Sequence, residues 1–190
     1  TGAVYIKWFN EPGQVLDCND YGSEFKWGSF TAIEGYGGYT IYIDLNGATI
    51  KNLIVADGVT MFSGTSWGGG NMIINVSNGS IRNVFMGSST SKFCGDYVEF
   101  YDVSISINFS GATTETFAGN NSFENRHLSF DNCAIYAVGS TLNSAPFIGC
   151  VMTDTDIELH IANQNQVKIF PYCTLTDCRI QGKVSGKAPD

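Results

Sequence analysis

The feature that most constrains the fold of this chain is an internal repeat. The segment 43–53, IDLNGATIKNL, returns 31 residues later at 74–84 as INVSNGSIRNV, with apolar, small, basic and Asn positions in step. A repeat of this kind indicates one structural unit that stacks on its own copies. The chain is therefore predicted to form a solenoid.

The core of the repeated unit, apolar-x-(Asn/Asp)-x-x-apolar, can be followed along most of the chain. Its copies are separated by 31, 19, 30, 22 and 23 residues: Ile50/Asn52/Val55, Ile81/Asn83/Met86, Phe100/Asp102/Ile105, Phe130/Asn132/Ile135, Met152/Asp154/Ile157 and Leu175/Asp177/Ile180. The last two copies agree best, because 147–154 and 170–177 share Phe, Cys, Thr and Asp at a constant offset of 23. Each copy is interpreted as one coil of the solenoid.

The period inside each unit indicates β-structure. Segments 103–109 and 157–161 alternate apolar and polar residues, which places every second side chain on an inner face. A charged content of only 15% and 22 glycines are typical of β-proteins. Units of this length, with several short strands, suit coils that stack in parallel at about 4.8 Å per rung.

Over residues 40–184 the sequence resembles the right-handed parallel β-helix of the pectate-lyase-like superfamily, which includes phage tailspikes and other virion appendages. The resemblance implies an all-β, right-handed parallel β-helix of about seven rungs with an aromatic-rich N-terminal cap. This fold carries lyases, hydrolases, adhesins and structural proteins alike, so it does not select a function. One domain is expected over 1–190, with the β-helix at 41–184 and a tail at 185–190.

Residues 1–40 differ from the rest of the chain. They hold nine of the 25 aromatic residues and no copy of the repeat. A solenoid must cover its open ends, so this segment is predicted to be a cap over the first rung. A docking arm that inserts into a partner is the alternative, because aromatic residues suit both kinds of contact.

The polar residue of each copy is interpreted as part of a turn ladder, in which a short side chain caps backbone N–H groups at a bend. The ladder comprises Asn52, Asn83, Asp102, Asn132, Asp154 and Asp177. Cys150 and Cys173 occupy one column of neighbouring rungs. A disulfide and a reduced stack of sulfur atoms both fit that position.

Composition argues against several classes of partner. A net charge of -8 and a pI near 4.6 disfavour binding to nucleic acid or anionic membranes. The longest apolar run, Cys133–Val138, has six residues, whereas a spanning helix needs about 20. The six cysteines include no CxxC pair, so no metal site and no cofactor are expected.

One outward cluster could carry chemistry. The 23-residue offset aligns Asp156 with Arg179, and Glu158 and His160 follow on alternate positions. Together these four residues could act as acid, base and electrophile. A solvated strand face with ion pairs between rungs is the favoured interpretation, since the same columns in earlier copies hold uncharged residues: Ser104, Ser106, Ala134 and Tyr136.

The family patterns also weaken the enzyme hypothesis. Pectate lyases use several acidic residues around calcium and an Arg as base, and polygalacturonase-like hydrolases use three Asp residues and a His. This chain has three Arg residues and no Asp-Asp pair. The protein is therefore not expected to be an enzyme.

Apolar residues occupy the outward column in the first two copies, at Ile54 and Phe85. Such side chains need a cover, supplied by the aromatic segment or by another subunit. The predicted interface is Ile54, Phe85, Trp8, Phe9 and Trp27. Side-by-side packing of three β-helices is common in phage tailspikes, so the resemblance implies a homotrimer.

Three functions are considered. The first is a non-enzymatic virion structural protein, a β-helical capsid-decoration, tail or fibre module that assembles with other virion proteins. The second is a secreted carbohydrate-active or carbohydrate-binding protein, with a glycan in a groove lined by Tyr101 and Tyr136. The third is an adhesin fragment of a cell-surface protein, which a first residue other than Met also fits. The expected location is extracellular or virion.

Overall fold

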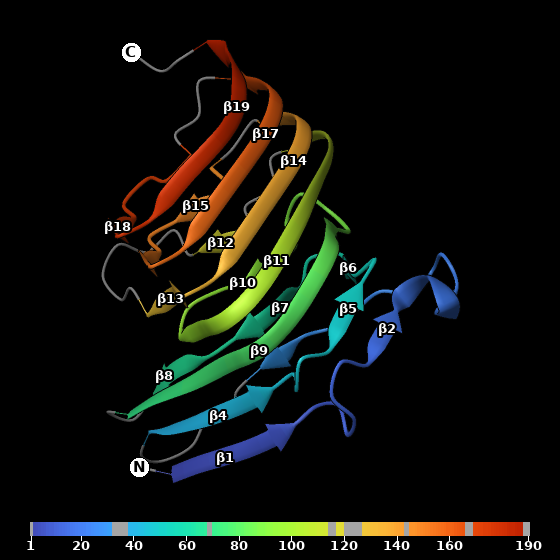
Figure 1. The fold of residues 1–190 in the computed structure, drawn as a ribbon, viewed down its shortest axis with the longest axis vertical. Helices are drawn as coiled ribbons and strands as arrows, with labels where there is room; N and C mark the ends of the chain where they lie inside the picture. Colours follow the sequence, from blue (N-terminus) through green and yellow to red (C-terminus); the bar gives the residue numbers. More distant parts are fainter. Residues whose placement is uncertain are drawn as a thin grey trace.

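The computed structural model describes residues 2–31, 38–67, 70–113, 117–119, 127–142, 145–165 and 169–187. Strands dominate these ranges. The one helix in them is a short 3₁₀ helix, η1 (Cys18–Tyr21). The strands follow one another along the long axis of the molecule, from the N-terminal to the C-terminal end (Figure 1). All pairings in the described ranges are parallel except that of β8 (Thr65–Trp67) with β9 (Gly70–Met86).

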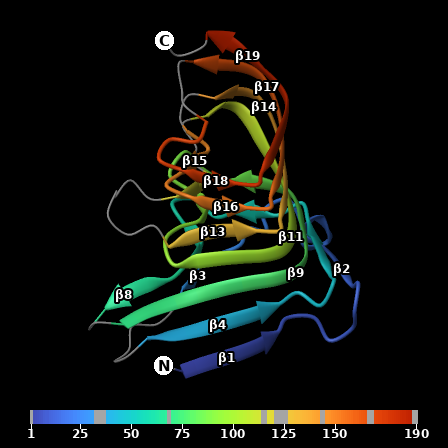
Figure 2. The ribbon, with the colours of Figure 1, turned by 60° about the vertical axis from the view of Figure 1, so that its left-hand side comes forward.

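The strands form three columns, and we call the segment that supplies one strand to each column a layer. Column 1, seen in Figure 2, contains β1 (Gly2–Lys7), β4 (Tyr39–Asp44), β9, β11 (Val98–Thr113), β13 (Leu128–Asp131), β16 (Val151–Thr153) and β18 (Thr174–Thr176). Column 2 contains β2 (Val15–Asp17), β5 (Thr49–Lys51), the second halves of β9 and β11, β14 (Ala134–Leu142), β17 (Asp156–Asn165) and β19 (Arg179–Lys187).

Column 3 is a separate five-stranded sheet. It contains β3 (Phe30–Thr31), β7 (Thr60–Ser63), β10 (Lys92–Cys94), β12 (Ala118–Gly119) and β15 (Phe147–Ile148). The short strand β6 (Ile54–Val55) pairs with the end of β9. The molecule is therefore all-β, with long parallel sheets whose strands come from successive segments of the chain.

The strand register confirms the repeat over most of its length. Ile50 pairs with Ile81, and Phe100, Phe130, Met152 and Leu175 follow one another in column 1. The second apolar position of the unit behaves in the same way in column 2, from Ile105 to Ile135, Ile157 and Ile180.

The predicted 19-residue step between the second and third copies is wrong. Ile81 pairs with Ile105, and Phe100 pairs with Val76, so the step is 24 residues. The error arises because β9 carries two polar bends, at Asn78 and at Asn83, and either one matches the motif around Asp102. The register places Asp102 opposite Asn78, a bend that is not among the six predicted copies.

All six residues of the predicted turn ladder have a left-handed backbone, with φ between 48° and 58°. Asn and Asp tolerate this conformation better than other non-glycine residues, which explains their recurrence at the bends. They belong to two ladders, however. Asn83 donates to Asn52, and Asn52 donates to Asp17, whereas Asn132 donates to Asp102 in the other ladder.

Residues 2–31 do not form the predicted cap. They supply a complete first layer, because β1, β2 and β3 pair in parallel with β4, β5 and β7. Trp27 also forms a bridge with Val55. The aromatic side chains of this layer, such as Trp8 and Phe30, pack against the core. Residues 32–37 lie outside the described residues.

A ladder of phenylalanine rings fills the interior beside column 3. Its members come from successive layers and contact one another at ring-centroid distances of 4.7–6.4 Å: Phe30, Phe62, Phe93, Phe117, Phe147 and Phe170. Such rings contribute large apolar areas and add stacking or edge contacts. The predicted pair Phe147 and Phe170 is the last step of this ladder, with centroids 5.4 Å apart.

The C-terminal boundary also differs from the prediction. β19 continues to Lys187, into the segment 185–190 that was expected to be a tail. Residues 188–190 lie outside the described residues.

Candidate functional site: an outward groove on column 2

An open groove of about 400 Å³ runs across the outer face of column 2. Its polar lining comes from five successive strands or strand segments and comprises Arg82, Ser104, Ser106, Tyr136, Asp156, Glu158, Arg179 and Gln181. These residues point outward because they alternate with inner residues such as Ile105, Ile135 and Ile157, which are buried. The strand period therefore builds the groove.

The predicted cluster lies in this groove or at its edge. β17 and β19 pair Asp156 with Arg179, Glu158 with Gln181 and His160 with Lys183, as the 23-residue offset predicted. Further down the column, Ala134 and Ser104 continue the Asp156 line, and Tyr136 and Ser106 continue the Glu158 line.

Asp156 and Arg179 form a bidentate ion pair. Arg179 Nε donates to Asp156 Oδ1 at 3.0 Å, and Nη2 donates to Oδ2 at 2.8 Å. The neighbouring Asp156 carboxylate raises the pKa of Arg179 above its ordinary value. Both side chains are exposed, so the pair orients the groups more than it stabilises the fold.

Glu158 has two neighbours of its own. Its Oε1 lies 2.6 Å from His160 Nε2, and Gln181 Nε2 donates to Oε2 at 3.4 Å. The hydrogen bond with His160 is the main reason that the pKa of Glu158 is lowered. A general acid needs a carboxyl group with a raised pKa, so Glu158 is poorly suited to that role.

Two side chains in the groove are suited to contact a ligand. The Tyr136 ring is 40% exposed and lies 5.7 Å from the His160 ring. The guanidinium of Arg82 has no ion-pair or hydrogen-bond partner within the described ranges. The sequence prediction missed Arg82, because the wrong 19-residue step took β9 out of register with β11. Alignment of Ile81 with Ile105, the apolar residues that follow the bends at Asn78 and Asp102, was the signal that could have placed Arg82 in the groove.

The predicted pairing of Tyr101 with Tyr136 in one groove is wrong. Tyr101 lines a different hollow, on column 1, together with Glu99 and Asp131. Tyr101 comes just before the bend of its layer, on column 1, whereas Tyr136 comes after the bend of the next layer, on column 2. They therefore cannot stack on the same sugar ring.

The predicted interface residues lie in the first layers. Ile54 pairs with Phe85, and both are half-buried. The Trp8 ring contacts Trp27 at 5.7 Å and the buried Phe62 at 6.2 Å. Trp8 and Trp27 therefore pack within the protein, and Phe9 packs against the same core.

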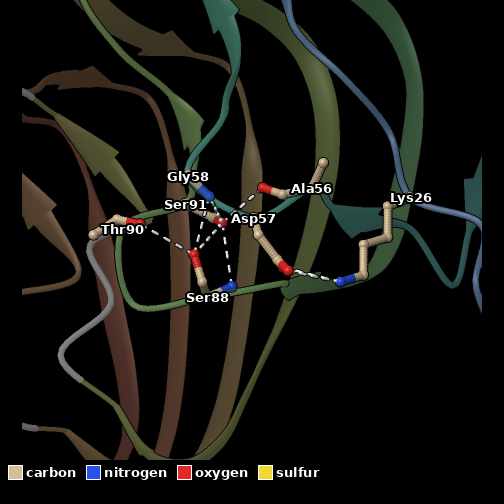
Figure 3. Close-up of polar contacts among 7 residues, drawn as sticks. All are labelled: Lys26, Ala56, Asp57, Gly58, Ser88, Thr90 and Ser91. Carbon is tan, nitrogen blue, oxygen red and sulfur yellow. Dashed lines mark hydrogen bonds and ion pairs between the residues drawn. The ribbon is translucent and has the colours of Figure 1, made fainter.

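A second polar cluster, which the repeat pattern did not predict, lies at a corner of the first layers (Figure 3). Ser91 Oγ donates to the Ala56 carbonyl at 2.7 Å, and the Gly58 amide donates to Ser88 Oγ at 3.0 Å. Lys26 forms an ion pair with Asp57 at the edge of the cluster. Because Ser91 is buried, these bonds satisfy polar groups at a turn, and we assign the cluster a structural role.

Comparison of the chain with protein-family models, with curated proteins and with solved structures gives no match in any of the three. Within the described residues, no group of three or more His, Cys, Asp or Glu side chains is arranged to hold a metal ion. The same residues include no helix with the length and hydropathy needed to cross a lipid bilayer.

Proposed function

We propose that this chain is a parallel β-helix module that works without catalysis, by protein–protein assembly. The observation that supports the proposal is the uncovered apolar column at the last layer. Met152, Ile157 and Ile161 are at most 2% exposed, whereas their register partners in the next layer are 38–48% exposed: Leu175, Ile180 and Val184. A further layer of β-structure, from another chain or another part of the same protein, would cover these positions.

The first layer presents a second open edge. Among the described strands β1 pairs with β4 alone, and Val4 and Tyr5 on it are exposed. β1 and β19 lie at opposite ends of the stack (Figure 2). A strand edge with free N–H and C=O groups is a template for pairing with another strand, so both ends suit assembly.

The resemblance of the repeat to phage β-helix modules extends this proposal to a virion structural component, with an extracellular or virion location. A homotrimer with other virion proteins as partners belongs to the same proposal. Lateral packing of three copies would use Ile54 and Phe85, which lie side by side on the outer face.

The first test is the absolute mass in solution, measured by light scattering over a range of concentration. We expect a trimer of about three times 20.6 kDa for the unmodified chain. Ile180→Asp places a charge at the open end, and Phe85→Ser removes the lateral apolar contact. Loss of the oligomer in I180D supports contact through the end, and its loss in F85S supports lateral packing.

Arg82→Ser, in the groove and away from both surfaces, is the control and should leave the mass unchanged. Circular dichroism verifies that each variant is folded. A strict monomer at every concentration, for the unmodified chain, would contradict self-assembly.

Glycan binding by the groove on column 2 is a second candidate function. An exposed aromatic ring beside fixed carboxylate, guanidinium and amide groups is the arrangement that supports it, at Tyr136, Glu158, Arg82 and Gln181. Sugar rings stack on aromatic faces while their hydroxyl groups bond to neighbouring polar groups.

A binding assay on immobilised polysaccharides tests this candidate. Tyr136→Ala should weaken binding roughly tenfold, because one aromatic contact is removed. Tyr101→Ala is the matched control and should leave binding unchanged, because Tyr101 lines the other hollow. The double change Glu158→Gln, His160→Asn should leave folding and assembly intact. Cleavage of a polysaccharide that depends on these two residues would contradict the non-catalytic proposal.

A further inference from the structure

Two cysteines face each other at the end of column 3. Segment 147–150 stacks on segment 170–173: the Phe147 and Phe170 rings are 5.4 Å apart, and the Gly149 amide donates to the Pro171 carbonyl. The Thr174 amide donates to the Cys150 carbonyl at 2.9 Å. Cys150 and Cys173 therefore occupy the same position in consecutive layers.

Their separation is compatible with a covalent bridge. Neighbouring parallel strands lie about 4.8 Å apart, and a disulfide needs Cα atoms roughly 4.4–6.8 Å apart. Cys173 Sγ lies 3.4 Å from the Cys150 amide nitrogen, so the sulfur is directed toward the neighbouring layer. Neither sulfur is part of a disulfide in this structure.

No other two cysteines occupy equivalent positions in adjacent layers. Cys133 and Cys178 have Thr155 between them, because Thr155 Oγ1 accepts from the Cys133 amide and Cys178 Sγ lies against the carbonyl of Met152. Two layers correspond to about 9.6 Å, which exceeds the reach of a disulfide. Cys94 pairs with Ala118, which pairs in turn with Phe147. Cys94 therefore lies two layers away from the segment 147–150 that contains Cys150.

Cys18 is held at the other end of the molecule. Its sulfur accepts a hydrogen bond from Trp27 Nε1 at 3.2 Å, within the first layer. Of the six cysteines, all of which the structure describes, Cys150 and Cys173 are the pair that stacking brings within bridging distance.

We propose that Cys150 and Cys173 form a redox-dependent disulfide that links the last two layers. The oxidant is a small-molecule disulfide. The Cys173 thiolate attacks one sulfur of that molecule and releases a thiolate, which takes up the proton that Cys173 lost. The Cys150 thiolate then attacks the Cys173 sulfur of the mixed disulfide and releases the second small thiol. Two protein thiols are oxidised, and one small disulfide is reduced to two thiols.

Burial determines the order of these steps. Cys173 is half-buried and can meet the oxidant, whereas Cys150 is fully buried. Burial is also the main reason that the pKa of Cys150 is raised well above its ordinary value, so few Cys150 thiolates exist at neutral pH. Bridge formation should therefore be slow near neutrality and faster as the pH rises.

The test is oxidation of the folded chain with oxidised glutathione, followed by alkylation and peptide mapping. Proteolysis before Asp177 separates Cys173 from Cys178, and Cys133→Ser leaves Cys150 as the only cysteine in its peptide. We expect a cross-linked Cys150–Cys173 peptide and a Tm that rises by roughly 5–10 °C. A reductant should reverse both changes.

Matched variants separate this bridge from general oxidation. Cys178→Ser should retain the cross-link and the rise in Tm, whereas Cys173→Ser should lose both. Circular dichroism of the reduced variants shows whether each still folds. Full alkylation of Cys150 and Cys173 after oxidation, or a cross-link of either one to Cys94 or Cys178, would overturn the proposal.

Discussion

Truncation of Phe130 to Ala is expected to lower the free energy of unfolding by about 3–5 kcal/mol, the usual cost of emptying a core aromatic site. Phe130 is fully buried, and its ring stacks on Phe100 with centroids 5.1 Å apart and packs edge-on against Phe147. Removal of the ring leaves a cavity between three layers. Thermal or urea unfolding followed by circular dichroism measures the loss, which should appear as a fall in Tm of roughly 6–20 °C.

Leu175→Ala is the matched control for this prediction. Leu175 occupies the same column two layers further on, but 38% of its surface is exposed. Its truncation should cost about 1 kcal/mol or less, because the lost side chain is only partly removed from water. Equal losses of unfolding free energy for the two variants would show that Phe130 is not more deeply buried than Leu175.

Substitution of Gly64 by Ala is expected to destabilise the protein by about 3 kcal/mol, through overpacking. A Cβ atom at Gly64 would lie 2.4 Å from the carbonyl oxygens of Met72 and Tyr97, and 2.5 Å from Tyr97 Cβ. These neighbours are backbone atoms or fixed to the backbone, so the layers themselves would have to move apart. The expected fall in Tm is roughly 6–12 °C.

Gly28→Ala tests whether this loss comes from crowding. A Cβ atom there would meet no heavy atom within 4 Å. Its effect should lie within about 1 kcal/mol, with a small gain from the reduced freedom of the unfolded chain. A Gly64→Ala variant as stable as Gly28→Ala would contradict the close approach of the layers at Gly64.

The sequence predicted the site only where the spacing between copies of the repeat was unambiguous. The constant offset of 23 residues between the last two copies was sufficient to place Asp156 beside Arg179 and Glu158 beside Gln181. Arg82 was missed, since β9 offers two bends that match one motif and only the observed pairing of Ile81 with Ile105 chooses between them.

The N-terminal segment shows the same limit. Its aromatic content indicated burial, and Trp8 does pack against the buried Phe62. Composition did not reveal that β1, β2 and β3 continue the three columns in register. Asp17, which ends β2 with an extended backbone, accepts a hydrogen bond from Asn52, and this bond is the main reason that its pKa is lowered to about 2. Through that bond it joins the ladder without the motif around it.

The sequence by itself determined that this chain is all-β and that its segments stack in parallel. Period-two alternation makes one face of each strand apolar, and a repeat of that pattern can bury it only against its own copies. The tertiary structure alone decided which residues lie opposite one another and which apolar positions stay uncovered. The connections between columns differ in length from layer to layer, so register is set by contacts between layers, and a position such as Ile180 is buried only where a further layer covers it.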